Sequence, residues 1–151
     1  MQLATCVFAA FMMLVSGVSA RADEPIEVAT IIDDPDVYHL RMVTLQGIVG
    51  RMRVLEPYFL PSGTACYGAY TFTLEDSGGS GAFIDVAVLG VCGRPIVLYP
   101  EIADGDKIAL QAEIQMPGRF GQSRSLFGRP PANGDQPAVQ AIAKTINRLG
   151  E

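Results

Sequence analysis

Two cysteines, Cys66 and Cys92, lie at equal distances along the chain from Gly79, and this symmetry restricts the folds open to the middle of the sequence. Two antiparallel strands joined by a turn at Gly79 would place the cysteines directly opposite each other. Residues of one parity share a face of a strand, so both sulfurs would lie on the apolar face of the hairpin. The facing pairs on this register are Leu74–Ile84, Phe72–Val86, Tyr70–Val88 and Cys66–Cys92. We therefore predict a disulfide on the core face of a β-hairpin.

The N-terminus has the pattern of an export signal. Residues 3–15 form an apolar run that is short for a membrane anchor, since a spanning helix needs roughly 20 apolar residues. The run is followed by small residues up to Ala20, as a signal cleavage site requires. We predict that residues 1–20 are a cleaved signal peptide, with cleavage after Ala22 as an alternative, and that residues 23–151 form one domain with no membrane span. A retained anchor, or a misread N-terminus, is the other interpretation of this run.

Export would remove Cys6 and leave two cysteines in the periplasm or outside the cell. A pair of cysteines in such an oxidising compartment is expected to be bridged. On the chain-entropy model the bridge from Cys66 to Cys92 would contribute about 3.5 kcal/mol. Two buried free thiols are the alternative. The formal net charge of −5 is typical of a soluble acidic protein and disfavours general nucleic-acid binding.

Hydrophobic periodicity predicts further strands on both sides of the hairpin. Residues 43–50 alternate between apolar and polar positions, with Gly47 where a strand bends or packs closely, as barrels need. Residues 107–116 alternate in the same way and form the clearest strand pattern of the chain. Residues 23–32 fit a short helix that is stopped by the acidic segment around Pro35.

Three other segments are less regular. Residues 51–69 and 117–137 contain several Pro and Gly residues without periodicity, and we predict a long loop for each. The last segment, residues 138–149, fits a helix by its apolar spacing and equally fits a strand that runs into a turn.

The order of these elements and several local phrases resemble exported bacterial OB-fold domain proteins. The phrases are Asp34-Pro35 with Tyr38, residues 43–47 (VTLQG), residues 70–78 (YTFTLEDSG), residues 105–108 (GDKI), and Ala141-Ile142 with Ile146. The resemblance implies an all-β fold, a five-stranded Greek-key barrel, in which residues 138–145 are the fifth strand. Such barrels commonly bind through strands two and three and through the loops after strands one and four. Fold alone does not establish function.

The two predicted loops concentrate arginine and aromatic side chains. Guanidinium and aromatic groups together suit an anionic or sugar-like ligand, or a protein partner. The alternative is a pair of solvated loops with no binding role. The candidate ligand-binding residues are Arg51, Arg53, Tyr58, Arg119, Phe120, Arg124 and Phe127, with Phe59 and Arg129 beside them.

Other features carry weaker signals. The solvent-facing side of the hairpin is expected to present Tyr67, Ala69, Thr71, Thr73, Glu75, Phe83, Asp85, Ala87 and Leu89. Most of these are small or acidic, whereas single-strand binders need aromatic platforms beside cations. His39 is the only histidine and is expected to have a surface or packing role, because one histidine does not make a metal site. The glycines near Gly79 fit a hairpin turn better than a phosphate-binding loop.

We therefore predict an exported, disulfide-stabilised OB-fold module that binds an unidentified ligand or protein in the cell envelope. We expect no cofactor, no metal and no catalytic residue, and hence no enzyme. The alternatives are an accessory or structural subunit of an envelope complex, and an enzyme whose active site the sequence does not reveal.

Overall fold

A computed structural model describes residues 24–94, 100–116 and 139–150 of the chain. In this part the helices are α1 (Val28–Asp33) and α2 (Pro35–Tyr38), and the strands are β1 (Met42–Val54), β2 (Tyr58–Phe59), β3 (Ala65–Tyr67), β4 (Tyr70–Glu75), β5 (Phe83–Val88), β6 (Val91–Cys92), β7 (Lys107–Gln115) and β8 (Gln140–Arg148). Neither of these helices has the length and apolarity that a membrane crossing would need. The predicted signal peptide and the predicted loop at 117–137 lie outside the described residues.

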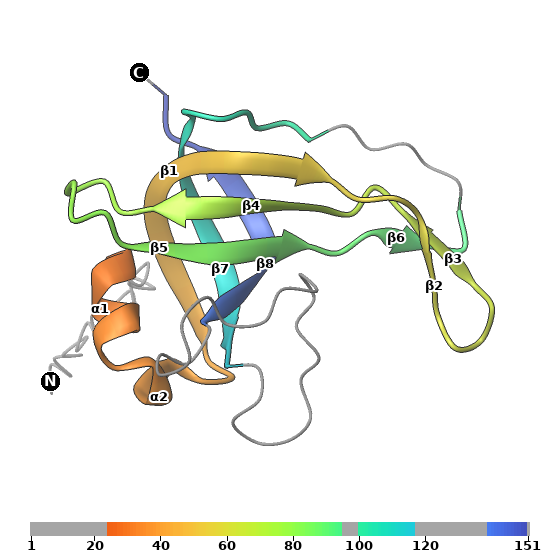
Figure 1. The fold of residues 1–151 in the computed structure, drawn as a ribbon, viewed down its shortest axis with the longest axis horizontal. Helices are drawn as coiled ribbons and strands as arrows, with labels where there is room; N and C mark the ends of the chain where they lie inside the picture. The colour runs from red at the N-terminus through yellow and green to blue at the C-terminus, as the bar shows by residue number, and fades with distance from the viewer. Residues whose placement is uncertain (1–23, 95–99, 117–138, 151) are drawn as a thin grey trace, which may run out of the picture.

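Five strands close into a barrel in the order β1–β4–β5–β8–β7 (Figure 1). β4 pairs antiparallel with β1 and with β5. β8 pairs parallel with β5 and antiparallel with β7. β1 completes the closure, because its first half pairs with β7 and its second half with β4. The predicted five-stranded Greek-key barrel is therefore confirmed.

The interior of the barrel is filled by the alternating positions that the sequence pattern indicated. Val43, Leu45 and Val49 of β1 are buried, and β7 alternates buried and less buried residues along its whole length. Fully burying one such aliphatic side chain is worth about 1.5–3 kcal/mol. α1 adds Val28 and Ile31 to the same core.

Gly47 is the point at which β1 changes partners, and the close packing predicted there is confirmed. A Cβ at this position would lie 2.4 Å from the carbonyl oxygen of Glu75 and 2.9 Å from Cγ of Leu74. No side chain fits in that space, so only glycine lets β1 pass so close to the end of β4.

The hairpin register predicted about Gly79 is also confirmed. β4 and β5 pair Leu74 with Ile84, Phe72 with Val86 and Tyr70 with Val88. Farther along, β3 and β6 pair Cys66 with Cys92, and the two residues form a disulfide.

The disulfide does not lie in the barrel core, and the prediction was wrong on this point. β3 and β6 join β2 in a separate three-stranded sheet that projects from the barrel (Figure 1). The ladder breaks between the Tyr67–Val91 pair and the start of the barrel, where a Cβ on Gly90 would lie 2.5 Å from the carbonyl oxygen of Tyr67. The two strands approach each other closely there and leave the barrel together. We call residues 55–68 with residues 89–93 the arm.

Other predictions need correction at their boundaries. Residues 51–69 are not one long loop, because β1 continues to Val54 and the segment also contains β2 and β3. α1 begins at Val28, later than predicted, and Ile26 before it forms a bridge to β1. Pro35 ends α1 as expected but also starts α2, a position that suits proline because the first helical N–H needs no partner.

The C-terminal segment forms β8, so the choice of a strand over a helix is confirmed. β8 runs from Gln140 to Arg148 and extends beyond the predicted end of the strand. The apolar residues of β8 have helical spacing, but its pairing with two strands prevails over it. The parallel ladder with β5 and the antiparallel ladder with β7 form the backbone hydrogen bonds that a helix would form internally.

The disulfide gives a first testable prediction. The double substitution of Cys66→Ser and Cys92→Ser should lower the free energy of unfolding by up to about 3.5 kcal/mol, because the unfolded chain loses a closed loop. Urea denaturation measures this difference, and hydrogen exchange should show that arm amides lose more protection than those of β4 and β5. The unsubstituted protein with reductant is the control. An unfolding midpoint that reductant leaves unchanged would contradict the prediction.

Candidate functional site

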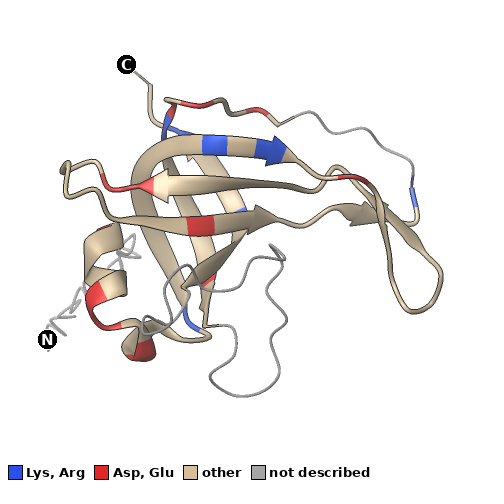
Figure 2. Cartoon of the chain, in the orientation of Figure 1, with Lys and Arg blue, Asp and Glu red and all other residues tan. Residues whose placement is uncertain are grey.

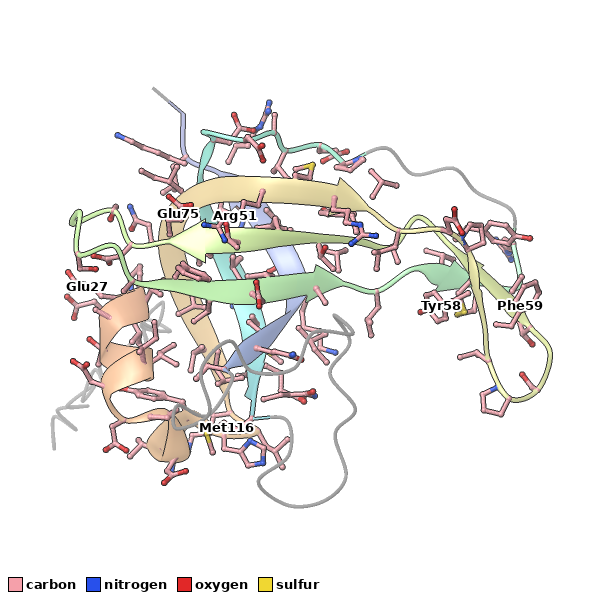
Figure 3. The ribbon with its side chains drawn as sticks, viewed as in Figure 1. Glu27, Arg51, Tyr58, Phe59, Glu75 and Met116 are labelled. Atoms are coloured by element: carbon pink, nitrogen blue, oxygen red, sulfur yellow. A yellow bond between two sulfur atoms is a disulfide. The ribbon has the colours of Figure 1, made fainter. Side chains whose placement is uncertain are left out.

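The structure separates the predicted binding residues. Arg51 and Arg53 lie in the second half of β1, whereas Tyr58 lies in the arm (Figure 3). Tyr58 faces Cys66 and is half-buried beside the disulfide. The remaining candidates, Arg119, Phe120, Arg124 and Phe127, lie outside the described residues together with Arg129. The described part of the predicted site therefore consists of the basic end of β1 and of Tyr58 in the arm.

A β-bulge sets the direction of the Arg51 side chain. Gly50 faces Thr73 and Arg53 faces Thr71, so β1 contains one residue more than β4 across this interval. Arg51 has a φ of 50°, in the left-handed region that costs an L residue roughly 1–2 kcal/mol. Bulges of this kind re-aim side chains next to functional sites.

The re-aimed side chain lies against an aromatic ring. The guanidinium carbon of Arg51 is 5.2 Å from the ring centroid of Phe83, which is cation–π range. Phe83 is on β5, and β4 lies between β5 and β1, so the arginine crosses β4 to reach it. Phe83 remains 44% exposed beneath this contact. A cation and an aromatic face are thus presented together on the outside of the barrel.

A polar notch lies beside this pair. A Cβ on Gly50 would be 2.7 Å from Oε1 of Glu75 and 2.9 Å from Oγ1 of Thr73, so both oxygens lie over the glycine. Thr73 is only 5% exposed, and among the described residues its hydroxyl has no hydrogen-bond partner. A buried polar atom without a partner costs about 1–3 kcal/mol. We call Gly50, Arg51, Thr73, Glu75 and Phe83 the outer-face site.

The outer face of the hairpin differs from the sequence-based expectation. Ala69, Thr71, Thr73 and Ala87 were expected to face solvent, but all four are buried. One physical cause is the bulge, since the Arg51 side chain that reaches β5 covers part of β4. Glu75, Phe83 and Leu89 are exposed as predicted.

The bulge is held in place by the turn that precedes β7. The N–H of Met52 donates to Oδ1 of Asp104 at 2.9 Å. The same turn is joined to β1 by two backbone bonds, from Val49 N–H to the Asp106 carbonyl at 2.9 Å and from Gly105 N–H to the Val49 carbonyl at 2.8 Å. The strained residue therefore lies in a backbone segment that is fixed from both sides.

Asp106 connects this turn to β8. Its carboxylate accepts a hydrogen bond from the N–H of Ala103 at 2.8 Å and another from Nε of Arg148 at 2.9 Å, and Nη2 of Arg148 also contacts it. The hydrogen bond from Ala103, together with that from Arg148, holds the pKa of Asp106 below its usual value. The carboxylate form is thus the one that ties the turn to β8.

The charges of the outer face are mixed. Figure 2 shows basic residues in the second half of β1 and acidic residues on the neighbouring β4 and β5. The positive charges of Arg51 and Arg53 are matched in number by the negative charges of Glu75 and Asp85, so the face has no strong net charge. Apolar side chains continue beside it, with Val54 at 60% exposed on β1 and Phe59 at 71% exposed in the arm.

The described residues offer little to a metal. Within residues 24–94, 100–116 and 139–150, no group of three His, Cys, Asp or Glu side chains is placed to hold an ion. His39 is half-buried, and its Nδ1 accepts a hydrogen bond from the N–H of Met116 at 3.2 Å. This contact gives His39 a packing role, as expected from the sequence.

Comparison with known proteins finds similarity only to solved structures. No family model matches the chain, and no curated protein matches it. A putative aspartyl-tRNA synthetase from Leishmania major Friedlin is similar with a TM-score of 0.54 and 12% identity, over 91% of this chain and 23% of that one. The aspartyl-tRNA synthetase from Entamoeba histolytica is similar with a TM-score of 0.54 and 10% identity, over 97% of this chain and 28% of that one.

These similarities concern the fold. The chain spans about a quarter of the length of each synthetase, and the identities are too low to carry over an activity. They agree with the OB-fold that the strand order displays.

The strain at the bulge can be measured. Arg51→Ala and Arg51→Gly both remove the contact with Phe83, but only glycine relieves the positive φ. We expect the glycine variant to be more stable than the alanine variant by about 1 kcal/mol in urea denaturation.

Arg53 is the matched control, because it lies on the same strand outside the left-handed region. At Arg53 the order should reverse, since glycine weakens an ordinary strand position. An alanine variant of Arg51 that equals or exceeds the glycine variant would show that the residue is unstrained.

The connection through Asp106 predicts a dependence of stability on pH. Because its pKa is lowered in the folded state, its stabilising effect is present above the usual carboxyl range, near about pH 4, and is lost as the pH falls through the folded value. Asp106→Asn should therefore lower the urea midpoint at neutral pH, and the difference from the unsubstituted protein should narrow at about pH 3. Glu56→Gln, on the exposed arm, is the control. A difference that stays constant across this range would be evidence against the connection.

Proposed function

We propose that this chain is an exported protein-interaction module of the cell envelope, which contacts its partner through the outer-face site and the adjoining part of the arm. The OB-fold and the disulfide support a binding module. The signal-like N-terminus supports export, and the bridged cysteines fit an oxidising compartment.

The observation that carries the proposal is the Arg51–Phe83 pair. The backbone of Arg51 is strained at a bulge, and its side chain lies on the exposed ring of Phe83. Arginine and aromatic residues such as phenylalanine are enriched at protein interfaces. The contact with Phe83 restricts the Arg51 side chain before the partner arrives, and this restriction lowers the entropy cost of association. A role of Arg51 in binding would explain why the strained backbone at this residue is retained.

The surrounding surface favours a protein partner over a polyanion. Arg51 and Arg53 are balanced by Glu75 and Asp85, whereas nucleic acid is bound by a surplus of basic groups along its phosphates. The arm adds exposed apolar side chains, and between Leu55 and Gly68 its only charged residue is Glu56. Alternation of apolar anchors and arginines is typical of protein interfaces. If the partner is permanent, the chain would be a structural subunit of an envelope complex.

The proposal is tested by site-specific crosslinking in the producing cell. A photo-crosslinking residue at Val54, beside the outer-face site, should capture a defined protein, and the same residue at Lys107 on β7 should not. The double variant Arg51→Ala with Arg53→Ala should abolish the Val54 product, whereas Lys107→Ala with Lys144→Ala, which removes the same charge elsewhere, should leave it.

Two results would contradict the proposal. One is a Val54 product that survives the loss of both arginines. The other is a gel shift of a single-stranded DNA probe by the purified protein that the arginine double variant no longer produces. That result would make the face a nucleic-acid surface instead.

A further inference from the structure

The barrel has an open mouth where β5 and β8 part. β8 pairs with β5 only from Gln140 to Ala143, while its second half continues along β7 alone. β5 meanwhile leaves the barrel toward the arm after Val88. The separation of these two strands leaves a space between the end of β5 and the second half of β8.

This space is a half-open cavity of about 500 Å³. Its volume lies within the range of about 300–1,000 Å³ that is common for small-molecule sites, which occur preferentially in places such as the mouths of β-barrels. The residues that line it are Gly68, Tyr70, Val88, Leu89, Glu101, Ile102, Lys144, Ile146, Asn147 and Arg148. The outer-face site contributes none of them.

The lining combines an apolar wall with a few polar groups. Val88 and Ile146 pack partly against the barrel core, and Ile102 is 5% exposed, so they give the cavity an apolar floor. Tyr70 is half-buried, with its ring stacked at 6.2 Å on Phe72. Burial, with the nearby negative charge of Glu101, raises the pKa of Tyr70, so its hydroxyl stays a neutral hydrogen-bond donor.

The charges of the mouth balance. Lys144 and Arg148 are basic and Glu101 is acidic, and Arg148 is already bound to the carboxylate of Asp106 just outside the lining. Among the described residues of the lining, the remaining positive group is Lys144 and the remaining negative group is Glu101, and both side chains are exposed. A simple anion would meet the repulsion of Glu101, and a simple cation that of Lys144. A ligand that carries both charges satisfies both side chains.

We propose that the barrel mouth is a binding site for a small zwitterion with an apolar body, of the class of apolar α-amino acids. The ammonium group of the ligand pairs with Glu101 beside the Tyr70 ring, and its carboxylate pairs with Lys144. The apolar body lies on Val88, Leu89 and Ile146. This site goes beyond the proposed interaction surface and does not depend on it.

Isothermal titration with L-phenylalanine as the probe tests the site. We expect saturable binding to the unsubstituted protein. Phenylalaninamide lacks the carboxylate and N-acetylphenylalanine lacks the ammonium group, and each should bind at least about tenfold more weakly, because each loses one charge-assisted contact.

Matched variants assign the two charges. Lys144→Gln should weaken phenylalanine binding at least about tenfold and should leave the already weak binding of the amide unchanged. Glu101→Gln should also weaken phenylalanine binding at least about tenfold, and it should leave the weak binding of the acetylated form unchanged. Lys107→Gln and Glu56→Gln make the same charge changes at residues that do not line the cavity, and both variants should bind phenylalanine normally.

Three results would contradict the proposed amino-acid site. No heat of binding with phenylalanine, equal binding of the three compounds, or equal loss in the control variants would each overturn the site. The arginine double variant used for the interaction surface should bind phenylalanine normally, so failure of one proposal is distinguishable from failure of the other.

Discussion

The bend of β1 is the constraint on which the rest of this structure depends. One strand of 13 residues has to pair with β7 through its first half and with β4 through its second half. Where β1 bends from one partner strand to the other, its backbone lies so close to the Glu75 carbonyl that a Cβ at position 47 would clash with it. Glycine at position 47 permits this close approach. Without this bend β1 could pair with only one of the two strands, and the sheet would stay open with unpaired edges.

The same strand delivers the candidate interaction surface. After the bend, β1 gains one residue relative to β4, and the bulge turns Arg51 over the sheet toward Phe83. The left-handed backbone conformation of Arg51 persists because the residues on either side of it are held independently. Gly50 pairs with Thr73, and the N–H of Met52 donates a hydrogen bond to Asp104. Closure of the barrel and presentation of the arginine are therefore consequences of one curved strand.

The arm depends on a different interaction. Its three strands are short, and apart from Cys66 its described residues are exposed or only partly buried. A sheet of this size buries too little apolar surface to be stable alone, which is the situation in which a disulfide contributes most. The bridge thus stabilises a projection outside the barrel, and it leaves side chains such as Phe59 exposed for contact.

Local patterns were sufficient for the hairpin register, for the alternation in β1 and β7, and for the role of Gly47, because a two-residue period and a symmetric cysteine pair have few solutions. They did not reveal the arm, the bulge or the barrel mouth. The bulge adds a residue to β1 relative to β4, the arm separates from the barrel where Gly90 approaches the backbone of Tyr67, and the mouth forms where β5 and β8 diverge. Each is a relation between strands, and such relations exist only once distant segments have paired.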